Sequence, residues 1–493
     1  MHTFPADMYH GWEIYPENLL LPPLESNVSN INLKLRRRSN ELFVENQKSI
    51  FWNLRLGLPR EDGTRDAVVE QIQSTECLTE ILSHSQETRM FFINQRFSWS
   101  RLYISEEHFR RLFTFLRVHP NFLDTVFLFS AKIGPEEEGY SSFFVDNDPS
   151  EAGNKPAVAG ELSGHYIGYN IKYVARHGRA LPKDPFSIRE IGVYQHYSSQ
   201  TGKCEWVFLQ APDQLKACLT RTFKCCEATL PIKQHMLHAL VLLHVSDGWR
   251  EYLAHLEEQF SGLVDKGFYT KVKGTQQEGG ISLDFSDLRK LHVLTDKLRR
   301  LSHLLRLNIR VGGQLKETLC RLGTAPSGDS RSGVISIQNK LNSFLVGQKI
   351  SADRVESLIL RSNGIGQLVQ SINDTRAVDA SNQINHEMKR LTEQGIEESK
   401  LMKKLTEKSA RDTRSMMVIA LISAVFLPAT FLATLFGSNF FDFSEHDHSL
   451  VIASNFWVYI LITTGFSCLS LLSWYVWRRR IEQSKALGDQ ESL

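Results

Sequence analysis

The residues best suited to chemistry stand at the end of a long apolar run, "LPATFLATLFGSNFF" at 427–441. Gly437, Ser438 and Asn439 close this run without a formal charge. A helix that only anchors a protein has no need of a glycine and a carboxamide at its end. At the mouth of a pore, neutral oxygens can hold a cation and release it, whereas a ring of carboxylates would hold it too tightly to release it. The triplet therefore poses two alternatives, a channel mouth or the end of an anchor.

Two other patterns could suggest an enzyme. His235, His238 and His244 occur in "KQHMLHALVLLHV", but no acid or cysteine nearby completes a ligand set, which favours histidines of a core or an interface. The segment "GTAPSGDS" at 323–330 has the glycine frame of a phosphate loop, but Asp329 replaces the required lysine and would repel phosphate. We therefore predict that the protein is not an enzyme.

A third pattern is the acidic segment "PEEEGYSSFFVDNDPSE" at 135–151, which includes Asp146 and Asp148. It lacks the spacing of a calcium loop. A solvated loop is the favoured interpretation, and a regulatory site for a divalent ion between subunits is the alternative. No metal site built wholly from protein ligands is predicted with these residues.

The composition limits the partners and the compartment. Lys+Arg number 57 and Asp+Glu 55, and this near-neutral balance argues against nucleic acid as the main partner. The seven cysteines are odd in number and form no CxxC pair, which indicates reduced thiols in a domain that faces the cytosol. The first residues, "MHTFPADMYH", resemble neither a signal peptide nor a mitochondrial presequence, so any targeting should come from the membrane segments.

Two charge-free runs extend from Ser415 to Phe441 and from Ser449 to Trp477. A helix needs about 20 apolar residues to cross a bilayer, so both runs are long enough. The loop between the runs has no lysine or arginine, and basic residues lie outside both runs. The positive-inside rule then predicts an integral membrane protein with both termini in the cytoplasm. The basic residues are Lys404, Lys408, Arg411, Arg414, Arg478, Arg479, Arg480 and Lys485, and the loop acids are Asp442, Glu445 and Asp447.

Pro428 lies inside the first run, where it removes a backbone donor and can kink a helix. A stripe of mostly small residues passes it at spacings of three and four. Such a stripe either lets helices pack closely or lines a narrow pore between identical helices. Its members are Met416, Ala420, Ser423, Leu427, Thr430 and Thr434.

The order of these residues resembles a known family. "FLPATF" at 426–431, "FGSNF" at 436–440, a short loop, a second span and Arg478–Arg480 look like the membrane part of CorA-type magnesium channels. That family has Gly-Met-Asn where this chain has Gly-Ser-Asn. The lead-in "EKSARDTRSMMVIALIS" at 407–423 is similar to that of fungal CorA-like proteins.

The resemblance implies a homopentamer in the lipid bilayer, with five first helices around the pore and no required cofactor. Gly437 would offer its carbonyl and Asn439 its amide at the pore mouth, with Thr430, Leu427 and Met416 facing the pore. Asp442, Glu445 and Asp447 would form an external acidic ring that raises the local cation concentration. Mg²⁺ would be the transported ion and a candidate regulatory ion.

One alternative is a non-conducting membrane-anchored scaffold or sensor of the same architecture. An ATP-driven pump would need the phosphate loop that the sequence lacks. Without a presequence, the plasma membrane or the vacuole is favoured over the mitochondrion.

The predicted fold class is an α+β cytoplasmic domain with a long stalk helix and two C-terminal transmembrane helices. Three runs at about 165–210 predict an antiparallel meander, and a helical hairpin at about 213–265 should cover it. Ser105 is a predicted N-cap. The predicted parts are an N-terminal region at 1–95, a mixed α/β domain at 96–280, long helices at 281–414, spans at 415–437 and 456–477, the acidic loop at 438–455 and a basic tail at 478–493.

Overall fold

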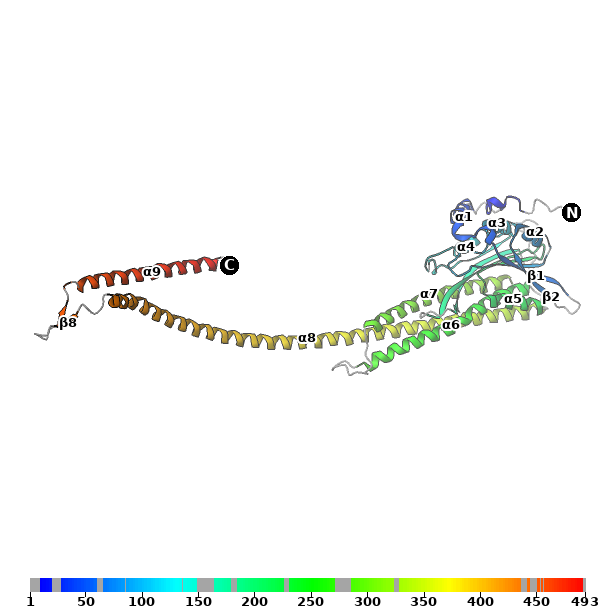
Figure 1. The fold of residues 1–493 in the computed structure, drawn as a ribbon. Coiled ribbons are helices and arrows are strands. Elements are labelled where there is room, and N and C mark those ends of the chain that lie inside the picture. Colours follow the sequence, from blue (N-terminus) through cyan, green and yellow to red (C-terminus); the bar gives the residue numbers. More distant parts are fainter. Residues whose placement is uncertain are drawn as a thin grey trace. The chain divides into compact units, whose positions relative to one another are not determined.

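The computed structural model describes the chain except residues 1–8, 20–27, 60–64, 85, 135, 149–163, 179–183, 226–229, 271–284, 323–327, 436–440, 444–449, 453, 455 and 491–493. Helices predominate after residue 213 and strands before it (Figure 1). The helices are η1 (Trp12–Ile14), α1 (Val28–Leu42), η2 (Asn46–Lys48), α2 (Thr75–Ser83), α3 (Glu106–Phe115), α4 (Phe122–Phe127), α5 (Asp213–Cys225), α6 (Leu230–Tyr269), α7 (Phe285–Leu322), α8 (Gly328–Leu435) and α9 (Phe456–Gln490).

A seven-stranded sheet has the order β2-β1-β3-β7-β6-β5-β4. β3 and β7 run parallel, and the other neighbours in this sheet run antiparallel. The antiparallel meander β5–β6–β7 confirms the prediction made from its three aromatic and β-branched runs. The strands are β1 (Phe51–Pro59), β2 (Arg65–Ile72), β3 (Thr88–Ile93), β4 (Phe143–Asn147), β5 (His165–Arg176), β6 (Phe186–Tyr197) and β7 (Cys204–Leu209), and a separate pair is formed by β8 (Phe441–Phe443) and β9 (Leu450–Ile452).

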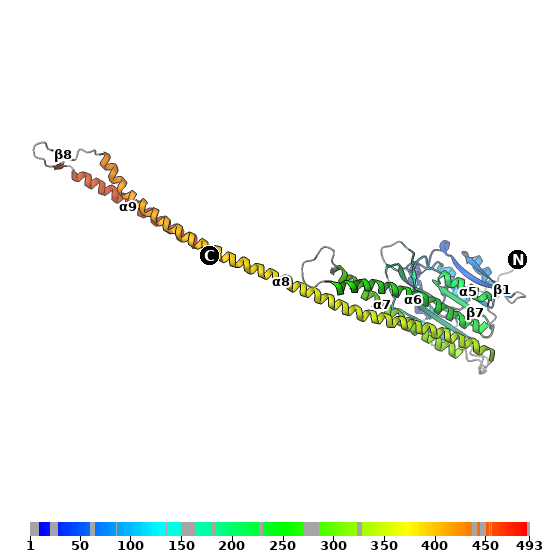
Figure 2. The same cartoon turned by 90° about the horizontal axis from the view of Figure 1, so that it is seen from below.

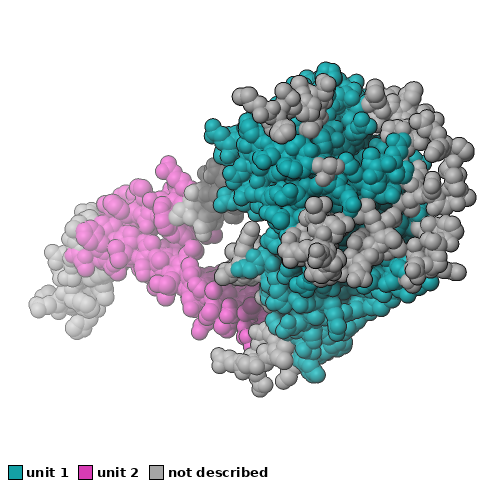
Figure 3. Space-filling model, turned by 90° about the vertical axis from the view of Figure 1, so that its right-hand side faces the viewer, with its two compact units in different colours: residues 1–375 teal, residues 376–493 magenta. Residues whose placement is uncertain are grey.

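The chain divides into two compact units, Met1–Thr375 and Arg376–Leu493, coloured teal and magenta in Figure 3. The first unit contains the seven-stranded sheet and the helices up to the first part of α8. The second contains the rest of α8, the β8–β9 pair and α9. The division falls inside α8, because a helix can continue after its packing partners end.

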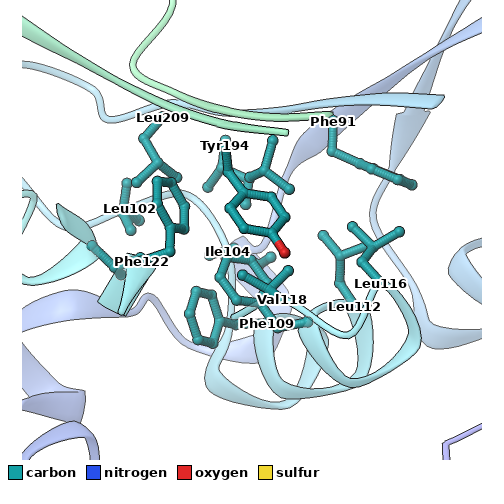
Figure 4. Close-up of a cluster of buried hydrophobic side chains, with 14 of the residues drawn as sticks. Phe91, Leu102, Ile104, Phe109, Leu112, Leu116, Val118, Phe122, Tyr194 and Leu209 are labelled. Carbon is teal, nitrogen blue, oxygen red and sulfur yellow. The ribbon is translucent and has the colours of Figure 1, made fainter. Parts of the chain in front are cut away.

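Both faces of the large sheet are covered. One face packs under α1 to α4, in a core that includes Phe91, Phe109 and Tyr194 (Figure 4). The other face packs against α5, α6 and the adjoining parts of α7 and α8. Strands covered on both faces have no polar alternation, and all six residues of β3 are buried accordingly.

Local signals in the sequence locate several helices correctly. The hydroxyl of Ser105 accepts a hydrogen bond from the backbone N–H of His108 at 3.2 Å, which confirms Ser105 as the N-cap of α3. α5 and α6 form the predicted helical pair after the meander, and α6 lies on the face of the sheet that carries Tyr169. The break between α7 and α8 falls within the predicted "GTAPSGDSRSG" segment, of which 323–327 lies outside the described residues.

The structure does not have the domain boundary that the sequence pattern predicts at residue 95. β1, β2, β3, α1 and α2 precede this point, yet they belong to the same sheet and core as the later strands. The connection is the parallel pairing of β3 with β7, in which Thr88 lies opposite Cys204. A pairing between segments so far apart leaves no trace in local hydrophobic periodicity, so local patterns do not reveal it.

Gly248 of α6 touches the backbone of β5, and a methyl group there would overlap the carbonyl oxygen of Val174. We expect Gly248→Ala to lower the free energy of unfolding by about 1–3 kcal/mol, because helix and strand must separate. Gly262, in the same helix, has no atom near its missing side chain. Gly262→Ala should therefore stabilise by up to about 1 kcal/mol through helix propensity. Thermal unfolding of the detergent-solubilised chain tests both, and equal melting temperatures for the two variants would contradict the assigned contact.

Candidate functional site

Two helices of the described chain are long and apolar enough to cross a membrane. The apolar segments of α8 and α9 have mean hydropathies of 2.3 and 1.7. Almost none of either segment is buried within this chain. Large apolar side chains on both helices are more than half exposed, including Phe431, Leu469 and Leu472. Surfaces of this kind need lipid or other protein chains as cover. The protein is accordingly an integral membrane protein.

Aromatic residues mark both ends of the apolar part of α9. Trp457 and Tyr459 lie near its start, and Trp474 and Trp477 lie where the basic residues begin. Trp457 and Trp477 are separated by roughly 30 Å at the rise of an α-helix, which matches the thickness of a hydrocarbon core. Tryptophan and tyrosine favour the two interfaces of a bilayer. The pattern indicates that α9 spans the bilayer between these two belts.

Pro428 leaves one backbone carbonyl of α8 without its helical donor, the carbonyl of Ala424 four residues earlier. The hydroxyl of Ser470 in α9 donates a hydrogen bond to that oxygen at 3.1 Å. The hydroxyl of Tyr459 also donates to the carbonyl of Ala429 at 3.4 Å. A carbonyl without a donor is costly in lipid, so α9 supplies what the proline removes. Figure 2 shows the last turns of α8 bending beside α9.

These contacts decide which face of α8 is covered. Leu432 is only 7% exposed, and Leu421, Ala424 and Pro428 are half-buried on the same side. The stripe Met416, Ala420, Ser423, Leu427, Thr430 and Thr434 is exposed throughout. With about 100° of rotation per residue, it lies roughly opposite the face that α9 covers. The structure thus brings Met416, Leu427 and Thr430 onto one open face of α8.

Thr430 has a specific orientation on this open face. Its hydroxyl donates within the helix, lying 3.1 Å from the carbonyl of Phe426 and 3.0 Å from that of Leu427. A hydroxyl has one hydrogen and two acceptor lone pairs. With the hydrogen used inside the helix, the oxygen can offer lone pairs outward, as a cation requires. Thr434 makes the same kind of bond to the carbonyl of Phe431 at 2.8 Å.

Several predicted site residues lie outside the described part of the chain. These are the triplet Gly437, Ser438 and Asn439 and the loop acids Glu445 and Asp447. Asp442 belongs to β8, where it pairs with Val451 of β9. The predicted loop at 438–455 thus contains a short antiparallel pair, and the predicted tail at 478–493 begins within α9.

The part of α8 before the membrane segment is a stalk without partners in the described chain. Residues 380–420 are all exposed, including Ile384, Met388 and Leu391. From residue 376 to 435 the helix extends about 90 Å at 1.5 Å per residue. Exposed apolar side chains along such a helix need other chains to cover them.

His235 and His238 of α6 belong to the core, whereas His244 is half-buried. His238 is fully buried between the hydroxyl of Tyr169, 3.0 Å from its Nδ1, and the amide oxygen of Gln195, 2.7 Å from its Nε2. Burial lowers the pKa of His235 to about 4 and that of His238 well below its usual value, so both are neutral. The described residues contain no group of three or more side chains that could hold a metal ion. The burial of His235 and His238 agrees with the favoured interpretation, histidines of a core or an interface.

Asp148 differs from the solvated loop residue that the sequence pattern favours. It is buried, and its carboxylate lies 3.0 Å from Nε2 of His196. The second ring nitrogen of His196 lies 3.6 Å from Glu205. Burial alone would lower the pKa of His196, but the hydrogen bonds to Asp148 and Glu205 outweigh it and raise the pKa to about 9. Asp148 therefore anchors the end of β4 to the sheet.

The pairing of protonated His196 with Asp148 should stabilise the fold only within a limited pH range. The pKa of His196 is about 9 in the fold and about 6.5 in the unfolded chain. The raised value means that its contribution is complete below about pH 6.5 and is lost as the pH rises through 9. We expect His196→Gln to lower the free energy of unfolding by about 2–3 kcal/mol at pH 6.5 and by much less near pH 10.

Denaturant unfolding of the full chain at several pH values measures this difference. His386→Gln, on the exposed stalk, serves as the control and should give no pH-dependent difference. A cost of His196→Gln that stays constant across this range would contradict the charged pair.

The link between Pro428 and Ser470 can be tested by a double-mutant cycle. Ser470→Ala should lower the free energy of unfolding by about 0.6–1.7 kcal/mol, which runs from the average to the largest value for hydrogen bonds between membrane helices. After Pro428→Ala, the new N–H can donate to the carbonyl of Ala424, so Ser470→Ala should then cost much less. Ser473→Ala, at an exposed serine of α9, is the matched control. Equal costs of Ser470→Ala in both backgrounds would refute the compensation.

The roles of Ser470 and Tyr459 are not predicted from the sequence. A signal was present, because a proline in a membrane helix requires a donor from elsewhere. The run at 449–477 holds several hydroxyl residues, however, and only the packing of α9 on α8 selects between them.

Two models of protein families match parts of this chain. Residues 7–267 match the model of a family described as CorA-like transporters, and residues 405–479 match that of CorA-like Mg²⁺ transporter proteins. The Notoamide biosynthesis cluster protein M' of Aspergillus versicolor is 37% identical over 59 residues, which are 12% of this chain and 13% of that protein. The chain thus spans a small part of that relative.

Two solved structures are similar over most of their length. The CorA magnesium transporter of Methanocaldococcus jannaschii is 11% identical with a TM-score of 0.35, over 87% of this chain and 97% of that one. The full-length CmaX protein is 11% identical with a TM-score of 0.36, over 88% of this chain and 98% of that one.

Proposed function

The chain belongs to the CorA-like transporters, and we propose on this basis that it is a divalent cation channel for which Mg²⁺ is the best-suited ion. The observation that carries the proposal is the open face of α8. Met416, Leu427 and Thr430 lie on it, away from α9. Several copies that turn these faces toward one axis would enclose a pore, with each α9 outside in the lipid.

Self-association explains the exposed surface of the stalk as well. A ring of chains would cover Ile384, Met388 and Leu391, which the single chain leaves open. We propose five copies, following the resemblance of the membrane part to CorA-type channels. The same copies would line the pore and bundle the stalks, so one assembly accounts for both surfaces.

The proposed pore combines two kinds of wall. Met416 and Leu427 would form apolar constrictions, which can close a pore by excluding water. Thr430 would place a ring of hydroxyl oxygens between such constrictions and the mouth, with lone pairs available because the hydroxyl hydrogen is used within the helix. A hydrated Mg²⁺ could exchange contacts with these neutral oxygens without being held tightly.

The proposed mouth lies at Gly437, Ser438 and Asn439. The carbonyl of Gly437 and the amide of Asn439 would receive the hydrated ion, while Asp442, Glu445 and Asp447 concentrate cations outside. With both termini in the cytoplasm, an inside-negative potential drives uptake by about 4.6 kcal/mol per 100 mV for a divalent ion. Such a channel fits a plasma or vacuolar membrane and needs neither a cofactor nor catalysis.

One residue favours a second candidate function. Ser438 stands where the CorA-type triplet has methionine. The same architecture without conduction would serve as a membrane-anchored scaffold or sensor. Ion flux separates the two candidates, whereas assembly does not.

The test is ion uptake by the purified chain in liposomes that contain a Mg²⁺-sensitive dye. We expect uptake by the wild type and at least roughly tenfold slower uptake by Asn439→Ala, equivalent to about 1.4 kcal/mol of lost stabilisation at the mouth. Asn455→Ala, in the same loop, is the matched control and should conduct normally.

Size measurement must show that the variants assemble as the wild type does. No uptake by a correctly assembled wild type, with or without internal Mg²⁺, would refute conduction and favour the scaffold.

A further inference from the structure

Basic side chains gather on two helices of the second unit at the same end of the apolar segments. α8 carries Arg411 and Arg414 just before its apolar run, and α9 carries Arg478, Arg479 and Arg480 just after its own. All five side chains are exposed. We call these five residues the arginine belt. Within the described chain, Arg411, Arg414, Arg479 and Arg480 form no ion pair with a carboxylate.

The contacts between the helices place the belt at one level. From Tyr459 to Ser470 the hydrogen-bonded position on α8 moves back from Ala429 to Ala424, so the helices run antiparallel. Measured from the Ser470–Ala424 bond, Arg480 and Arg414 are each ten residues away in the same direction. Both arginines therefore lie roughly 15 Å from that bond along the helices.

The aromatic residues of α9 give the depth of this level in a bilayer. Trp474 and Trp477 immediately precede the belt, and tryptophan favours the headgroup region. The guanidinium of Arg478 lies over the ring of Trp474, 5.4 Å from its centre. The belt thus lies where the phosphates of phospholipids lie.

We propose that the arginine belt binds the phosphate groups of anionic phospholipids in the leaflet on its side of the membrane. Guanidinium groups form two parallel hydrogen bonds to a phosphate and keep their charge at every physiological pH. The proposal rests on membrane insertion and is independent of ion conduction. The spans contact the hydrocarbon core while the arginine belt binds the charged headgroups of the leaflet. The protein therefore prefers membranes rich in anionic lipid.

The charges farther along the stalk provide the matched control. Lys389, Arg390 and Lys400 lie on the same helix as Arg414, but Lys400 is already about 21 Å from it. Exposed charges beyond a Debye length of about 8 Å are largely screened. Replacing these three residues with glutamine removes as much charge as replacing Arg478, Arg479 and Arg480, without touching the belt.

The experiment compares the full chain in nanodiscs of phosphatidylcholine alone and of phosphatidylcholine with phosphatidylserine. We expect phosphatidylserine to raise the melting temperature of the wild type and of the stalk triple variant. The variant with Arg478→Gln, Arg479→Gln and Arg480→Gln should lose more than half of this shift while matching the wild type in phosphatidylcholine. Inorganic phosphate added to phosphatidylcholine discs should give no shift.

A second variant keeps the test decisive if the first does not assemble. Arg411→Gln with Arg414→Gln removes the α8 part of the belt and should also reduce the shift. Equal melting temperatures in both lipids, or a full shift in the belt variants, would overturn the proposal. A shift with inorganic phosphate alone would overturn it as well, because the site would then recognise a soluble anion. None of these readouts needs ion flux, so they remain informative if conduction fails.

Discussion

The hydrogen bond from Ser470 to the carbonyl of Ala424 is the contact on which the membrane part depends. Pro428 removes the donor that this carbonyl would have had, and lipid offers no replacement. α9 must therefore lie against this side of α8. Once that side is covered, the stripe from Met416 to Thr434 is left on the open side. A single missing N–H thus determines which face remains for other chains.

In the first unit, too, buried polar groups need hydrogen-bond partners, and there the sheet and its covering helices supply them. Its sheet is covered on both faces, so polar groups inside it need partners within the protein. His238 bridges Tyr169 and Gln195 as a neutral ring, and His196 is held as a cation by Asp148 and Glu205. These pairs stabilise the core of the first unit.

Local patterns in the sequence predicted much of this fold. The N-cap at Ser105, the meander of β5 to β7 and the long helices follow from residues close together in the chain. The placement of β1 to β3 was missed, because it depends on the pairing of Thr88 with Cys204. The burial of Asp148 was missed for the same reason. Its acidic neighbours suggest solvent, whereas in the fold His196 from another strand pairs with the buried carboxylate.

By itself, the sequence determined that two apolar segments are long enough to span a bilayer, that a proline interrupts the first and that basic residues flank both. These features depend only on composition and spacing along the chain. Tertiary structure alone decided which hydroxyl replaces the lost donor, which face of α8 stays open and which arginines share one level. The reason is physical: periodicity gives each helix its faces, but the rotation and register of two helices follow from contacts between residues distant in sequence.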